Sequence, residues 1–281
     1  MKRVLTAALL IVVVVALIFF GHLWMLTLAS CLAAELAAYE YVKLANASSG
    51  RVPVWWMTAA IALLFYFTNF RPLDSPLPVL SLLALTLLAW AAFGDDLERV
   101  LRDAALGLFG LMYIGYPLLL VPLIWSRPQG DGKPLILFLM VCVWSGDIAA
   151  LYVGRSFGKH KLSSLSPNKT WEGAIASVVG SVIAGLAVVF LGDFLSARGN
   201  TVLHVLEPLW ESALLAAIIN IAAQLGDLLE SAIKRGAGVK DSGSMLPGHG
   251  GILDRIDALL LAAPVLWVVL LLKDAFGLGR F

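Results

Sequence analysis

Nine apolar runs place the strongest limit on how this chain of 281 residues can fold. A helix that crosses the hydrocarbon core needs about 20 mostly apolar residues, and most of the runs approach that length. They are continuous and lack a period of two, which favours helices over barrel strands. The sequence therefore predicts an all-α, polytopic integral membrane protein with about nine transmembrane helices, although the tight Gly21-His22 connection keeps eight or ten open. The runs cover residues 4–20, 23–42, 54–70, 77–93, 104–126, 134–153, 173–191, 209–230 and 258–273.

The composition excludes most soluble classes. Hydrophobic residues make up 60% of the chain and charged residues 14%, whereas an ordinary globular domain carries about 25% charged residues. As a water-soluble domain, such a chain would expose very large apolar patches. The net charge of +1 and the scattered basic residues give no reason to expect a nucleic-acid partner. Cys31 and Cys142 lie inside apolar runs without metal-ligand spacing, so we expect inert thiols.

The distribution of basic residues predicts the orientation. With the N-terminus in the cytoplasm and nine spans, 14 of the 20 Lys and Arg residues fall on the inner side and 6 on the outer side. This asymmetry follows the positive-inside rule. It also places two polar loops, residues 154–172 and 231–257, on the same cytoplasmic face. We therefore expect a multi-pass protein with a cytoplasmic N-terminus.

The charged residues are concentrated in the second half of the chain. Residues 154–172 and 227–257 make up 50 of the 281 positions but hold 14 of the 39 charged residues. Topology explains basic loops, but it does not explain interleaved acids, which cost up to ~3 kcal/mol each near the bilayer centre. Without repeats or low-complexity linkers, residues 1–281 are predicted to form a single membrane domain. Within it, residues 1–130 carry no recognised motif and residues 131–281 form the catalytic half.

One helix is expected to carry a polar stripe. Asn220, Gln224, Asp227, Ser231 and Lys234 follow one another at intervals of 4, 3, 4 and 3 residues. This spacing places them on one face of a helix, which must be turned toward the protein interior or water. For the two amides, interhelical hydrogen bonding is an equally good explanation. For Asp227, Ser231 and Lys234, a functional role is favoured.

The segment after this helix has the residues of a phosphate site. Its glycines let backbone amides approach an anion closely. Asp254 and Asp257 lie three residues apart at the start of the last helix, where they can share a metal or cap the helix. Hard oxygen ligands near phosphates favour Mg²⁺ over zinc. The glycines are Gly243, Gly248, Gly250 and Gly251.

These residues resemble a known signature. The segment 231–257, which reads SAIKRGAGVKDSGSMLPGHGGILDRID, is similar to that of the phosphatidate cytidylyltransferase (CDP-diacylglycerol synthase) family. Residues 154–162, 166–173 and 224–227 also resemble that family. One position departs from it, because Leu151 stands where an aromatic residue is expected and Tyr152 is its neighbour. This departure puts the role of Tyr152 in doubt.

The resemblance implies an integral enzyme of the inner (cytoplasmic) membrane whose active site faces the cytoplasm. The implied nucleotidyltransferase joins CTP and phosphatidic acid into CDP-diacylglycerol and pyrophosphate. It requires a divalent metal, expected to be Mg²⁺, and a second cation is left open. By the resemblance, Asp227 and Asp254 hold the metal, and Asp257 is a weaker metal candidate. Ser231 and Lys234 fall at active-site positions, so the expected catalytic residues are Asp227, Ser231, Lys234 and Asp254.

The nucleotide carries about four negative charges, so fixed cations must counter electrostatic repulsion. Positive-inside topology is the competing explanation for the basic residues of the first loop. The expected partners are CTP, phosphatidic acid and membrane lipids, and a homodimer is left open. The residues expected to bind the substrates are Lys159, Lys161, Lys169, Arg235, Lys240, His249, Gly250, Gly251 and Arg255.

Other functions compete with this one. A CTP-dependent lipid kinase or an isoprenoid-lipid cytidylyltransferase can use similar residues. A transporter can use Asp147, Asn220, Gln224 and Asp227 as a path, but the chain shows no pair of broken helices in inverted repeats. Asp147 is expected either to complete a polar cavity or to pair with Arg155.

Overall fold

A computed structural model describes residues 2–48, 50–69, 75–94, 96–127, 131–203, 208–245 and 250–277. Within these ranges the regular elements are helices, and an isolated antiparallel bridge pairs Lys161 with Thr170. Side chains are described from residue 11 onward.

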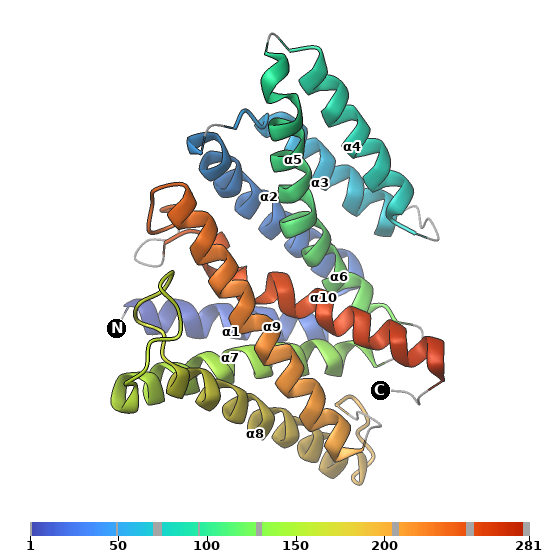
Figure 1. The fold of residues 1–281 in the computed structure, drawn as a ribbon. Helices are drawn as coiled ribbons and strands as arrows, with labels where there is room; N and C mark the ends of the chain where they lie inside the picture. The colour runs from blue at the N-terminus through green and yellow to red at the C-terminus, as the bar shows by residue number, and fades with distance from the viewer. Residues whose placement is uncertain are drawn as a thin grey trace. The chain divides into compact units, whose positions relative to one another are not determined.

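Each predicted apolar run coincides with a helix (Figure 1). In the first half these are α1 (Lys2–Phe20), α2 (Leu23–Ala47), α3 (Val54–Asn69) and α4 (Leu77–Ala92). A 3₁₀ turn, η1 (Leu97–Arg99), then leads into α5 (Val100–Gly110), the π-helical η2 (Leu111–Gly115) and α6 (Tyr116–Trp125), which follow without a break. The second half holds α7 (Gly132–Phe157), α8 (Trp171–Ser196), α9 (Leu209–Gly236) and α10 (Leu253–Phe276).

Six helices among the described residues are long and apolar enough to cross a membrane: residues 23–47, 97–125, 132–157, 171–196, 209–236 and 253–276. α3 and α4, with 16 residues each, and the described side-chain part of α1, residues 11–20, are shorter apolar helices. A helix of 16 residues is about 24 Å long, less than the ~30 Å hydrocarbon core. The prediction of an all-helical membrane protein is confirmed, whereas nine spans and the orientation stay predictions.

The chain forms two compact units, each built from separate segments. The first consists mainly of residues 22–123 and 232–256, and the second mainly of residues 124–231 and 257–281. α9 and α10 therefore each contribute to both units.

In the first unit, α2 packs against α5 through close contacts. The Tyr41 hydroxyl donates a hydrogen bond to the Leu106 carbonyl oxygen at 2.8 Å. Gly110 permits this approach, because a Cβ there would overlap the Tyr41 ring and come within 2.8 Å of Met57. Tyr41 itself is 2% exposed.

In the second unit, small residues bring α7, α8 and α9 together. A Cβ on Gly185 of α8 would lie 3.0 Å from the Phe138 ring and 3.1 Å from the Ala216 Cβ. A Cβ on Gly146 of α7 would overlap the side-chain amide of Asn220. Small residues at helix contacts are typical of membrane proteins, where close backbone approach supplies the packing. Of the two thiols, Cys142 is buried and Cys31 is half-buried.

Candidate active site

Three carboxylates converge in the second unit. Asp227 and Glu230 lie three residues apart on α9, and Asp257 lies on α10. One ligand oxygen from each falls within 4.8 Å of the others. Gly226 allows the two helices to approach, because a Cβ there would lie 2.6 Å from the Asp257 carbonyl oxygen. We call these three residues the carboxylate cluster.

The chemistry of this cluster fits a hard divalent cation. Mg²⁺ binds to one or two carboxylates and completes its shell with water and phosphate oxygens. Converging carboxylates repel one another, and Glu230 is 0% exposed, so a cation would lower the cost of keeping them together. Asp227 and Asp257 were predicted from the sequence, but Glu230 was not. Its position three residues after Asp227, on the same helix face, was the signal that could have identified it.

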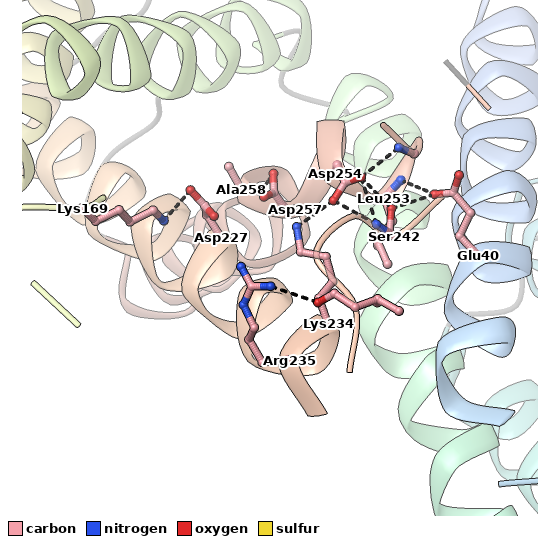
Figure 2. Close-up of polar contacts among 12 residues, drawn as sticks. Glu40, Lys169, Asp227, Lys234, Arg235, Ser242, Leu253, Asp254, Asp257 and Ala258 are labelled. Carbon is pink, nitrogen blue, oxygen red and sulfur yellow. Dashed lines mark hydrogen bonds and ion pairs between the residues drawn. The ribbon is translucent and has the colours of Figure 1, made fainter. Parts of the chain in front are cut away.

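Lys169 is brought to the cluster by the loop between α7 and α8. Its ammonium group forms an ion pair with the Asp227 carboxylate (Figure 2). The Leu162 amide donates to the Lys169 carbonyl oxygen at 2.8 Å, so this loop folds back on itself. Thr170 then caps α8 by accepting a hydrogen bond from the Gly173 amide at 3.2 Å. These local contacts place Lys169 beside Asp227.

The other basic residues of this loop lie elsewhere. Lys159 and Lys161 are exposed. The His160 Nδ1 atom lies 2.6 Å from a Glu172 carboxylate oxygen, and the Lys159 amide donates to the same carboxylate at 3.2 Å. Glu172 thus fastens one end of the loop, and Lys169 is the predicted lysine that reaches the carboxylate cluster.

A polar cavity of about 810 Å³ adjoins Asp227 in the second unit. Its volume is in the range of ordinary ligand pockets. Asp147 lines it together with Arg155, which agrees with the expectation that Asp147 completes a polar cavity. Leu151 also lines it, whereas Tyr152 is 69% exposed on α7. Other polar lining residues are Ser166, Asn168, Lys169, Thr170, Ser177, Gln224 and Asp227.

The hydrogen-bond network behind the cavity fixes the orientation of Gln224. Ser181 donates its hydroxyl to the Cys142 carbonyl oxygen at 2.5 Å, and it accepts from Asn220 Nδ2 at 2.7 Å. Asn220 Oδ1 therefore accepts from Gln224 Nε2 at 2.7 Å, and this nitrogen also donates to Ala174 at 3.2 Å. Because a carbonyl can only accept, the direction of the whole chain is determined. Both hydrogens of Gln224 Nε2 are thus engaged, and the residue lines the cavity.

In the first unit, Asp254 organises the segment between α9 and α10. Lys234 Nζ lies 2.7 Å from Asp254 Oδ1 in a mostly buried ion pair (Figure 2). The other carboxylate oxygen accepts from the Gly251 amide at 2.8 Å, the Ser242 hydroxyl at 2.9 Å and the Ser242 amide at 3.1 Å. We call residues 237–252 the signature loop, of which 246–249 lie outside the described residues. Asp254 holds both described ends of this loop.

The remaining predicted residues have simpler surroundings. Ser231 is half-buried on α9. Arg235 donates to the Val239 carbonyl oxygen at 3.1 Å, which helps to close the end of α9. Lys240 and Arg255 are exposed. Gly250 has φ +77°, a conformation that glycine adopts without strain. His249 lies outside the described residues.

One buried acid in the first unit was missed by the sequence analysis. Glu40 on α2 is 1% exposed, and its Oε2 atom accepts a hydrogen bond from the Leu253 amide at 2.9 Å. A carboxylate inside an apolar run is expensive, and that was the signal that could have singled it out.

Comparisons with known proteins relate the chain to one group of enzymes. A family model described as "Cytidylyltransferase family" matches residues 1–273. The phosphatidate cytidylyltransferase of Brucella suis biovar 1 is 44% identical over 163 residues, which are 57% of this chain and 54% of that protein. That of Synechocystis sp. is 42% identical over 154 residues, which are 53% of this chain and 48% of that protein. The chain thus spans about half the length of these two relatives. The phosphatidate cytidylyltransferase of Staphylococcus aureus (strain COL) is 31% identical over 271 residues, which are 96% of this chain and 98% of that protein.

Proposed function

Since this chain belongs to the cytidylyltransferase family, we propose that it transfers the cytidylyl group of CTP to phosphatidic acid in phospholipid biosynthesis. The products are CDP-diacylglycerol and pyrophosphate. The observation that carries the proposal is the position of Asp227, which belongs to the carboxylate cluster and also lines the polar cavity beside Lys169. Anionic ligands and a cation can meet at such a position.

The reaction needs electrostatic assistance more than it needs a nucleophilic side chain. A phosphate oxygen of phosphatidic acid attacks the α-phosphorus of CTP, a new P–O bond forms, and the bond to the β-phosphate bridging oxygen breaks. Both reactants are anionic, so the barrier is dominated by repulsion and by charge on the leaving pyrophosphate. When bound at Asp227, Glu230 and Asp257, Mg²⁺ would neutralise phosphate charge. The resemblance also implies Asp254 as a metal ligand, but the structure pairs Asp254 with Lys234 in the first unit and does not group it with these three carboxylates.

The chain's own cations are proposed to bind the phosphates. Lys169 and Arg155 line the cavity and carry the positive charge that a triphosphate requires. Because Lys169 pairs with Asp227, its ammonium group is already oriented toward the carboxylate cluster. In the other unit, Lys234, positioned by Asp254, is proposed to act on phosphate charge, with Ser231 nearby in sequence.

We propose nine spans with a cytoplasmic N-terminus and an active site that faces the cytoplasm of the inner membrane. The ion pair between Lys169 and Asp227 supports one part of this topology. It brings the α7–α8 loop to the C-terminal part of α9, which supports placing the two on the same side of the bilayer. The 14 to 6 distribution of basic residues makes that side the cytoplasmic one.

A reconstitution with two labels tests the proposal. Purified protein in detergent is given phosphatidic acid, Mg²⁺ and CTP labelled at either the α- or the γ-phosphate. Cytidylyl transfer moves only the α-label into lipid, and it releases the γ-label as pyrophosphate. Entry of the γ-label into lipid would indicate a lipid kinase instead, and product formed only from an isoprenoid phosphate would change the substrate class. Absence of any product from CTP with either lipid would favour the transporter.

A further inference from the structure

We propose that Glu40 is a positioning residue for the active site, although it lies on α2, far in sequence from the signature loop. Its carboxylate fixes the described ends of that loop and the start of α10, and through them the Asp254–Lys234 pair. The catalytic consequence rests on the proposed function, but the structural one does not.

The burial of Glu40 is the first argument. Its side chain is 1% exposed, whereas Glu35, the other acid of α2, is half-buried. A buried carboxylate is tolerated where donors compensate for lost hydration. The donors here come from a segment about 200 residues away in sequence, as Figure 2 shows for Ser242 and Leu253. The acid therefore serves a long-range contact and not its own helix.

Glu40 acts as an N-terminal cap for α10. Leu253 is the first residue of that helix, and its amide donates to Glu40 Oε2 at 2.9 Å. The first amides of a helix have no acceptor inside the helix, and the positive end of its dipole favours a carboxylate. Asp254, the next residue, is thereby fixed in position.

Ser242 connects the two acids. Its hydroxyl lies 3.1 Å from Glu40 Oε2 and 2.9 Å from Asp254 Oδ2, and its one hydrogen can be donated to either acid. Asp254 in turn pairs with Lys234 at 2.7 Å. A continuous series of polar contacts thus runs from α2 to Lys234. A shift of Glu40 would be transmitted to both residues of the ion pair.

The backbone of the signature loop is shaped around this carboxylate. A Cβ on Gly243 would overlap the Oε1 atom of Glu40, and a Cβ on Gly251 would overlap Oε2. Both glycines are therefore needed where the loop closes on Glu40. The contact at Gly243 involves only Glu40 among the three nearest atoms, which makes it suitable for a coupling test.

The test compares Glu40→Ala, Glu40→Gln and the control Glu35→Ala, which removes a half-buried acid from the same helix. We measure amide hydrogen exchange by mass spectrometry together with kcat for CDP-diacylglycerol formation. Glu40→Ala should raise exchange in residues 240–245 and 250–253 on the order of tenfold, with other helices unchanged. It should lower kcat on the order of a hundredfold, because catalytic groups are displaced. Glu40→Gln keeps an oxygen acceptor, so its kcat should stay within about fivefold of wild type.

A double-mutant cycle keeps the proposal falsifiable if Glu40→Ala fails to fold. Gly243→Ala alone should lower kcat, because its new Cβ displaces Glu40, and adding it to Glu40→Gln should not rescue that loss. Where Glu40→Ala does fold, Gly243→Ala added to it should cost little more. Normal kcat and normal loop exchange in Gly243→Ala would overturn the proposal even where Glu40→Ala does not fold. Where Glu40→Ala folds, normal kcat and exchange in that variant would overturn it, as would a full effect of Gly243→Ala in the Glu40→Ala background. If the wild-type enzyme forms no CDP-diacylglycerol, the proposed function fails, whereas the exchange data still decide whether Glu40 holds the loop.

Discussion

At the scale of single residues, Asp227 belongs both to the carboxylate cluster and to the lining of the cavity in the second unit. Its side chain is 37% exposed, while Glu230 of the same cluster is buried. Asp227 can therefore face a ligand in the cavity while it shares a cation with Glu230 and Asp257. Lys169 pairs with Asp227 and lines the same cavity, so its ammonium group lies where a phosphate would be bound.

Asp227→Asn is expected to abolish metal-dependent turnover while the protein stays folded. The amide keeps the size of the side chain but removes the charge that binds Mg²⁺. A loss of ~4 kcal/mol of barrier stabilisation corresponds to about a thousandfold in kcat. The measurement is turnover at saturating CTP across a Mg²⁺ titration, with thermal unfolding as a folding control. Asp193→Asn, at the far end of α8, should leave turnover unchanged. Near-normal turnover in Asp227→Asn would remove this carboxylate from the mechanism.

Lys169 and Lys159 provide a matched pair in one loop. Lys169→Gln removes the cation beside Asp227, so KM for CTP should rise on the order of tenfold, about 1.4 kcal/mol of binding. Lys159 is exposed and directed elsewhere by the structure, so Lys159→Gln should change KM by less than about twofold. Steady-state kinetics at fixed ionic strength separate the two. Equal effects would mean that the loop acts through its overall charge.

At the scale of elements, the sequence predicted where helices occur better than where they end. The run at 134–153 became α7 (Gly132–Phe157), and the run at 258–273 became α10 (Leu253–Phe276). Hydropathy marks the lipid-facing part of a helix, while its polar ends continue into the site. Caps such as Thr170 explain the true boundaries. The sequence left open whether Asn220 forms interhelical hydrogen bonds or has a functional role. In the structure its side chain donates to Ser177 and Ser181 of α8, a contact that the sequence alone could not predict.

Asn220→Ala is expected to lower stability more than activity. The change removes one partner of Ser177, Ser181 and Gln224 inside a buried network, and such losses cost about 1–3 kcal/mol. The midpoint of thermal unfolding in detergent should fall, while kcat per folded molecule changes far less than in Asp227→Asn. Asn200→Ala, at an exposed loop position, provides the control. An unchanged midpoint would contradict the structural role.

At the scale of the whole molecule, the sequence predicted the class and much of the site, but not its long-range partners. Asp227, Asp257 and Lys169 meet as their positions on polar segments suggested. Glu40 could not be connected to Ser242 from the sequence, because the two are 202 positions apart and no local pattern relates them. The single membrane domain and its nine spans stay predictions.

Cysteine labelling tests the topology. In a variant without Cys31 and Cys142, single cysteines at Leu165 and Ser244, both exposed, should react with an impermeant maleimide only after the membrane is opened. A cysteine at Asn200, between α8 and α9, should react in intact cells. If α8 spans the membrane, its two ends lie on opposite sides, so Asn200 is expected on the outer side when Leu165 is on the inner side. Labelling of position 165 or 244 from outside would place the loops on the wrong side for cytoplasmic CTP.

The contact of Glu40 with the start of α10 also bears on how such chains can be shortened or recombined. A fragment that began after residue 130 would contain every motif of the signature, and a motif search would accept it as complete. It would nevertheless lack the acceptor for the Leu253 amide and the surface around which Gly243 and Gly251 close. A chimera that exchanged the N-terminal half for one without an acid at this place would inherit the same defect. Through Glu40, the part of the chain with no recognised motif thus contributes a contact that the start of α10 and the signature loop require.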